Sequence, residues 1–331
     1  MTRLEQYVAK LDGVGASEML LGPGRPPLYR SANGLVPLPD EPAISGEELD
    51  PLLEAWFGQE RWAYLHSHRA LSCVMGLGPY PRLRVRCTLA NRGATLQLRL
   101  LDAPFELSEL LLPMQLAQLA DLSSGLVIIT GPSGNGKTNA LASLLQLVSE
   151  RRRRHIVTLE HPIELLHHSR ISSISQRELP THCPSFASGV RSALSANADV
   201  IVLGKPDDAE LCDIGARAAH SALVLAEVPG RGCVAVLERL VATSAARGDC
   251  ANLSDAFAGI AALELLPKKN GGHVPACEII LRSPVVCAAL REGKPGAVAK
   301  VPGPDYGPGS QTMEASKLEL SRQGLIETRV S

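Results

Sequence analysis

One stretch near the middle of the chain, residues 125–150, constrains the fold more than any other. It begins with a continuous apolar and largely β-branched run at residues 126–130, which is typical of a parallel strand buried on both faces. A glycine-rich loop at residues 131–138 follows, and apolar residues at helical spacing come directly after it. The stretch therefore predicts a strand, a tight loop and a helix in succession, which favours the α/β class with a parallel sheet.

The loop itself carries a chemical signal. It reads GPSGNGKT and fits the pattern G-x-x-x-x-G-K-[ST] at every fixed position. Glycines allow backbone N–H groups to converge on an anion, and the N-terminus of the next helix adds a partial positive charge. In such a loop Lys137 reaches the β- and γ-phosphates and the Thr138 hydroxyl ligates Mg²⁺. We therefore expect ATP or ADP to bind, and the expected contacts are Gly131, Pro132, Ser133, Gly134, Asn135, Gly136, Lys137, Thr138 and Asn139.

Composition places this loop in an ordinary globular protein. The 331 residues are enough for two domains with separate cores, and 45% of them are hydrophobic. A net charge of −1 and an aromatic content of 3% both disfavour nucleic acid as a partner. No apolar run approaches the roughly 20 residues of a membrane span, so we expect a cytoplasmic protein without direct membrane insertion. The eight cysteines form no C-x-x-C pair, so neither a zinc site nor a disulfide framework is indicated.

Residues 1–102 predict a small α+β domain. Leu4, Val8 and Leu11 lie on one face of a helix expected over residues 2–11. Asn33-Gly34 between two apolar runs is a hairpin signal. A capping box at residues 45–48 starts a second helix, which we expect to end at about Phe57. Strands are expected at residues 16–21, 71–75, 82–89 and 94–101.

A connector at residues 103–112 leads to the second domain, residues 113–331. From Leu116 onward apolar strands alternate with helices, which is the signature of a parallel sheet. Beyond the loop and its helix, strands are expected at residues 156–159, 199–204, 223–226 and 279–281, and helices at residues 190–196, 211–220 and 311–324.

Several segments outside the loop resemble one family. They are GASEMLL and GRPPLYR at residues 15–21 and 24–30, RLRV at 82–85, TLEHPIE at 158–164, QRE at 176–178, RSAL at 191–194 and LPKKNGG at 266–272. With the loop, they are similar along nearly the whole chain to the secretion-superfamily ATPases, most closely the type IV pilus retraction, or twitching-motility, ATPases.

The resemblance implies a RecA-like P-loop domain with a central, mostly parallel sheet, preceded by a small α+β, PAS-like amino-terminal domain. Proteins of this kind are cytoplasmic hexameric rings that act on an inner-membrane platform protein of a pilus or secretion system. Their amino-terminal domain closes on the ATP of a neighbouring subunit, so the resemblance suggests Arg82 and Arg84 as nucleotide contacts. Because Arg82, Arg84 and Arg86 alternate with apolar residues, a solvated strand face is the other interpretation.

Four positions depart from the family pattern. In the segment that resembles the aspartate box, Glu160 keeps the first carboxylate and His161 replaces the second. Lys205 stands where the family has a glutamate at the end of the Walker B-like strand. Pro229 stands in place of the histidine of the histidine box, and Ser195 in place of a second arginine.

The change at Lys205 bears on phosphoryl transfer. Replacing a carboxylate by an ammonium changes the local charge by two units, and the ammonium repels Mg²⁺. Such a loss costs several kcal/mol of transition-state stabilisation, on the order of a thousandfold in rate. Lys205 is therefore either a counter-charge for the phosphates or a turn residue. Glu160 either positions the attacking water, which would make it the catalytic residue, or caps the turn at Pro162.

We therefore expect an ATP-binding subunit of a type IV pilus or type II secretion motor with weak or absent hydrolysis, in a regulatory or paralogous role. One alternative is an active hexameric retraction motor that uses Glu160 in a remodelled site. The other is a structural or sensory adaptor whose nucleotide site is vestigial.

Overall fold

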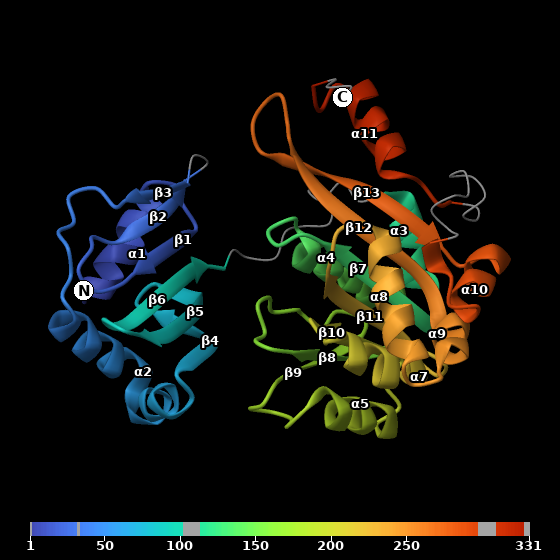
Figure 1. The fold of residues 1–331 in the computed structure, drawn as a ribbon, viewed down its shortest axis with the longest axis horizontal. Coiled ribbons are helices and arrows are strands. Elements are labelled where there is room, and N and C mark those ends of the chain that lie inside the picture. The colour runs from blue at the N-terminus through green and yellow to red at the C-terminus, as the bar shows by residue number, and fades with distance from the viewer. Residues whose placement is uncertain (1, 32–33, 102–112, 297–308, 328–331) are drawn as a thin grey trace. The chain divides into compact units, whose positions relative to one another are not determined.

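The computed structural model describes residues 2–31, 34–101, 113–296 and 309–327 and divides the chain into two compact units (Figure 1). The first unit is Met1–Ala103 together with Pro162–Leu165. The second is Pro104–His161 together with Leu166–Ser331. The connector predicted at residues 103–112 lies outside the described residues.

The first unit is a six-stranded antiparallel sheet with two helices. Its strand order is β3-β2-β1-β6-β5-β4, and β2 pairs with β3 as the predicted hairpin. Both helices begin at capping boxes, at Thr2 and at Ser45. Their apolar residues are buried with the inward-facing residues of the strands in one core. The elements are α1 (Arg3–Gly13), β1 (Glu18–Leu21), β2 (Leu28–Ser31), β3 (Gly34–Pro37), α2 (Gly46–His68), β4 (Ala70–Leu77), β5 (Tyr80–Ala90) and β6 (Gly93–Leu100).

The predicted end at about Phe57 coincides with a kink at Gly58, and the helical segment that follows as far as His68 was not predicted. Gly58 has φ 74° and ψ 166°, a conformation that glycine adopts readily because it has no Cβ to clash with the backbone. The segment after the kink is mostly polar and exposed, with Leu65 its buried apolar residue. It therefore lacks the apolar periodicity from which a helix is predicted.

The second unit is built on a seven-stranded sheet of order β13-β12-β7-β11-β10-β8-β9. All neighbouring strands are parallel except β12 and β13, which form a long antiparallel hairpin at one edge (Figure 1, orange). The predicted α/β class with a mostly parallel sheet is therefore confirmed. The strands are β7 (Gly125–Gly131), β8 (His155–Glu160), β9 (Ser173–Glu178), β10 (Val200–Gly204), β11 (Leu223–Pro229), β12 (Phe257–Pro267) and β13 (His273–Leu281).

Helices cover both faces of this sheet. On β7, Leu126 and Ile128 pack into one core cluster, while Val127 and Ile129 pack into another with the apolar face of α4. This alternation confirms that the strand before the glycine-rich loop is buried on both sides. The helices are α3 (Met114–Gln118), α4 (Lys137–Arg151), α5 (Phe186–Ser195), α6 (Asp208–Glu210), α7 (Ala216–Ala218), α8 (Cys233–Ala245), α9 (Cys250–Ala256), α10 (Pro284–Arg291) and α11 (Met313–Arg322).

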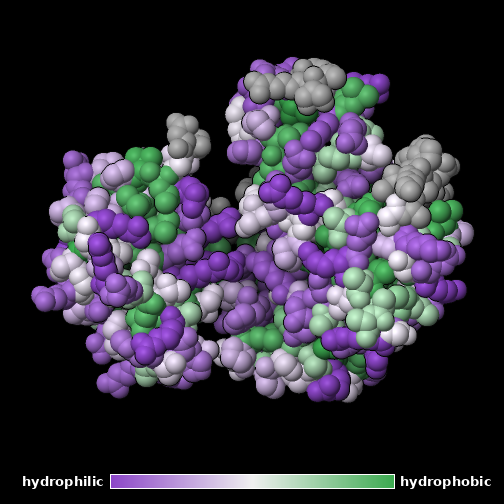
Figure 2. All heavy atoms as spheres, in the orientation of Figure 1, coloured by the Kyte–Doolittle hydropathy of each residue, from purple (hydrophilic) through white to green (hydrophobic). Residues whose placement is uncertain are grey.

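The face of the molecule shown in Figure 2 mixes residue types. In the space-filling view, hydrophobic patches are interspersed with hydrophilic residues (Figure 2). Within the described part of the chain, no helix combines the length and the apolar character needed to cross a bilayer.

Candidate functional site

The glycine-rich loop, residues 131–138, joins the carboxyl end of β7 to the start of α4. Gly131 has φ 148°, and a Cβ there would lie 2.6 Å from the carbonyl oxygen of Leu263 on β12. Only glycine therefore fits where the loop leaves the sheet. The side-chain oxygen of Asn135 accepts a 2.8 Å hydrogen bond from the backbone N–H of Leu265, which ties the loop to the same strand. The strand, loop and helix thus lie as the sequence predicts.

Lys137 folds back over this loop. Its Nζ donates a 2.9 Å hydrogen bond to the carbonyl oxygen of Pro132, and the residue is only 8% exposed. Burial lowers the pKa of Lys137, while the charge of Glu227 opposes that shift and Lys205 adds to it. An ammonium held at the mouth of the loop is suited to meet an anion there.

The structure brings a residue to this site that the sequence analysis missed. Glu227, on β11, is 3% exposed, and its Oε2 accepts a 2.9 Å hydrogen bond from the Thr138 hydroxyl. In the parallel register Glu227 lies beside Ile129 of β7 and Gly204 of β10. A single acidic residue inside the apolar run LVLAEV is a signal that could have identified it, because a carboxylate is buried only where it has partners.

Lys205 lies directly beyond β10 in the same cluster. Its Nζ is 4.0 Å from Oε1 of Glu227, and its side chain is 35% exposed. Its backbone has φ +63°, which is uncommon for a residue with a Cβ and costs about 1 kcal/mol. The sequence predicts that the site has lost a negative charge and gained a positive one, and this prediction considers Lys205 without Glu227. The structure places a buried carboxylate beside it.

Glu160 closes the cluster at the end of β8. One of its oxygens accepts hydrogen bonds from the Thr158 hydroxyl at 2.7 Å and the Gln176 amide at 3.3 Å. Burial is the largest influence on the pKa of Glu160 and raises it. The two hydrogen bonds and the charge of Lys205 partly oppose this increase. A Cβ on Gly204 would lie 3.0 Å from Cγ of Glu160, so the glycine allows the ends of β8 and β10 to approach closely.

Other predicted residues have contacts of their own. The His161 ring is within hydrogen-bonding distance, 2.7 Å, of the carbonyl oxygen of Leu179. Arg82 and Arg84 belong to the first unit, where they contact the Ile163 carbonyl and the Glu164 carboxylate respectively. Arg86, on the same strand, is exposed.

The donor set around Thr138 suits a hard cation. A hydroxyl oxygen and a carboxylate lie side by side, and oxygen ligands of this kind are those that Mg²⁺ prefers. Among the described residues, no group of three or more histidine, cysteine or acidic side chains forms a metal site independent of a nucleotide.

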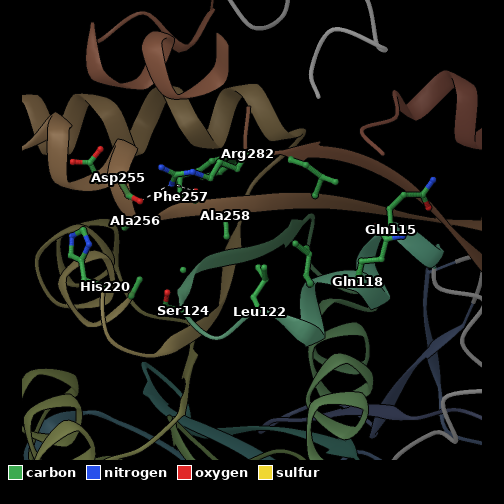
Figure 3. Close-up of a pocket in the computed structure, with 14 residues that line it drawn as sticks. Gln115, Gln118, Leu122, Ser124, His220, Asp255, Ala256, Phe257, Ala258 and Arg282 are labelled. Carbon is green, nitrogen blue, oxygen red and sulfur yellow. Dashed lines mark hydrogen bonds between the residues drawn. The ribbon is translucent and has the colours of Figure 1, made fainter. Parts of the chain in front are cut away.

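A cavity of about 560 Å³ lies at the opposite edge of the sheet (Figure 3). Residues at or just before the amino ends of β7, β11 and β12, including Gly125, His220 and Phe257, line it. Two of its polar side chains already have partners: His220 bonds Asn252, and Arg282 donates to backbone carbonyls. Ligands of open α/β sheets bind at the carboxyl ends of the strands, which assigns the functional site to the glycine-rich loop.

Sheet order, loop geometry and helix placement together define an α/β protein of the P-loop class. The family described as Type II/IV secretion system protein matches residues 82–299, and the chain belongs to this family. It is similar to the twitching motility protein of Neisseria gonorrhoeae, with 31% identity over 86% of this chain and 78% of that protein.

Two further comparisons agree. The pilus retraction ATPase PilT of Pseudomonas aeruginosa is 27% identical over 98% of this chain and 95% of its own length. A crystal structure of the pilus retraction motor PilT with bound ADP superposes with a TM-score of 0.83 at 28% identity, covering 99% of this chain and 95% of that one. The resemblance to secretion-superfamily ATPases close to the retraction ATPases is therefore confirmed.

Proposed function

We propose that this chain is an ATP-binding subunit of a type IV pilus or type II secretion motor that hydrolyses ATP slowly or not at all. ATP or ADP binds at residues 131–139, with Lys137 on the phosphates and Thr138 as the protein ligand of Mg²⁺. The subunit joins a homo- or hetero-hexamer in the cytoplasm and acts through an inner-membrane platform protein. The similarity to retraction motors supports this assignment.

One observation carries the proposal of slow hydrolysis: the Lys205 ammonium stands at the end of β10, and both oxygens of the carboxylate beside it, Glu227, are already engaged. Glu227 accepts a hydrogen bond from Thr138 and lies 4.0 Å from the Lys205 ammonium. Glu160 accepts hydrogen bonds from Thr158 and Gln176. A carboxylate that orients or activates water needs an oxygen directed to that water. At the end of β10, where the resemblance predicts that group, the chain has an ammonium.

The rate consequence follows from transition-state electrostatics. Charge spreads over the γ-phosphate oxygens during cleavage, and a positioned water must attack in line. Loss of one positioning group costs about 3–4 kcal/mol, or roughly two to three orders of magnitude in rate. Binding is not lost in the same way, because a lysine near the phosphates supplies a counter-charge.

The experiment pairs binding with turnover on the purified full-length chain. We expect a non-hydrolysable ATP analogue to bind, binding to be lost in Lys137→Ala, and Lys269→Ala at an exposed turn to bind as the wild type does. Phosphate release with Mg²⁺ should be at least a hundredfold slower than that of Pseudomonas aeruginosa PilT measured alongside. Turnover equal to PilT would refute slow hydrolysis and favour an active motor. No nucleotide binding would favour the vestigial adaptor.

A further inference from the structure

Glu227 lies on β11, next to the strand that leads into the glycine-rich loop, rather than on β10, which Lys205 follows. The sheet order β7-β11-β10 places it between them (Figure 1). It shares a face of β11 with Leu223 and Leu225, which pack into the cluster beneath α4. Its carboxylate therefore points toward the start of α4, where Thr138 is located.

The direction of the Thr138 hydrogen bond has a consequence for the hydroxyl oxygen. A threonine hydroxyl has one proton to donate and two lone pairs to share. Its proton is directed to Glu227 at 2.9 Å, so the lone pairs remain available to an electrophile. A hydroxyl held in this orientation is prepared to ligate a cation, because the carboxylate increases the electron density on its oxygen.

The carboxylate of Glu227 offsets the positive charge that Lys205 brings to the cluster. The cluster contains two lysines, Lys137 and Lys205, and two carboxylates, Glu160 and Glu227. The ammonium at the end of β10 is thus matched by a carboxylate one strand closer to the loop. Thr138, the residue that would ligate a divalent cation, contacts Glu227 directly.

We propose that Glu227 is a positioning residue for the Mg²⁺ of the bound nucleotide and acts through the Thr138 hydroxyl. In this chain the carboxylate that supports the metal comes from β11, and Lys205 occupies the place on β10. This inference rests on the proposed nucleotide binding. A purely structural pair, in which Glu227 only holds the start of α4, is the alternative to be separated from it.

The test measures ADP affinity by titration calorimetry on the full-length chain, with saturating Mg²⁺ and with EDTA. We expect Glu227→Gln to weaken ADP binding tenfold or more with Mg²⁺, because the metal loses its supporting carboxylate. In EDTA the same variant should bind ADP several-fold more tightly, because a negative charge near the phosphates is gone. Glu278→Gln, which removes a carboxylate that accepts from the Cys233 N–H elsewhere in the same unit, should change neither affinity.

The opposite directions of the two effects distinguish the roles. A structural Glu227 would weaken binding equally with and without Mg²⁺, and that result would overturn the proposal. A second variant, Lys205→Met, leaves Glu227 in place. This variant should strengthen the dependence of ADP affinity on Mg²⁺. An unchanged dependence would also contradict the inference. If the wild type binds ADP neither with Mg²⁺ nor with EDTA, the proposed function itself fails. If the wild type binds ADP and Glu227→Gln has the same dependence on Mg²⁺ as the wild type, this inference alone fails.

Discussion

Replacing Lys205 by methionine should destabilise the second unit, and only while Glu227 is charged. Methionine has a similar length and a Cβ, so the strain of φ +63° is the same in both proteins. Two unit charges 4.0 Å apart interact by about 4 kcal/mol at an effective dielectric constant of about 20. The Lys205 side chain is 35% exposed, and solvent screening reduces this to about 1–2 kcal/mol. Glu227 is 3% exposed, so little water replaces the lost partner.

The assay is thermal unfolding without nucleotide or Mg²⁺, followed by far-ultraviolet circular dichroism. Tryptophan fluorescence is unsuitable, because both tryptophans, Trp56 and Trp62, lie on α2 of the first unit. A loss of about 1–2 kcal/mol corresponds to a fall in Tm of roughly 2–8 °C for a unit of this size. In the Glu227→Gln background, which keeps the shape of the side chain, the same substitution should change Tm by less than about 1 °C. An equal fall in both backgrounds would refute the reasoning, because it would show that Lys205 does not stabilise the fold through Glu227.

Three further predictions concern other parts of the molecule. Burial raises the pKa of Cys87 and of Cys277 to about 12, so at pH 8 iodoacetamide should label the half-exposed Cys73, Cys250 and Cys287 first, as mass spectrometry of peptides will show. Gly131→Ala should lower Tm more than Gly271→Ala does: both positions have positive φ, but only the first places a Cβ 2.6 Å from a backbone oxygen. Glu160→Gln should raise Tm at neutral pH. Because burial raises the pKa of Glu160 in the folded protein, the folded state binds a proton more readily than the unfolded state. The gain in Tm should therefore disappear as the pH falls below the ordinary value of a glutamate, and a gain that persists at low pH would contradict this cause.

The region around the loop could be predicted from sequence because independent local patterns agree there. The apolar run at residues 126–130, the glycines and the helical spacing of leucines each indicate the same strand, loop and helix. The predicted bounds match β7 and α4 to within a few residues. Local agreement of this kind does not require knowledge of the rest of the fold.

Other elements depend on partners that are distant in sequence. β12 is rich in alanine and contains a glycine, residues with low strand propensity, and no strand was predicted there. It forms because β7 pairs with it on one side and β13 on the other. β9 and helices α8, α9 and α10 were also not predicted. Glu227 was missed for a similar reason: the parallel register that pairs it with Ile129 brings it to Thr138, a residue 89 positions away in the sequence.

The pairing of Gly204 with Glu227 also determines how a carboxylate can be restored at the end of β10. In Lys205→Glu a second carboxylate would stand on the strand next to Glu227, and the repulsion between two nearby like charges disfavours the ionisation of both. The single substitution should therefore add little to ATP turnover.

Lys205→Glu combined with Glu227→Gln leaves one ionised carboxylate, now at the end of β10, where the family resemblance places it. We expect this double variant to turn over ATP at least tenfold faster than either single variant, measured as phosphate release with Mg²⁺. The control is Lys205→Gln with Glu227→Gln, which removes both charges and should not gain activity. A single Lys205→Glu variant as fast as the double one would show that the two positions are independent and that Glu227 does not govern the charge of this site.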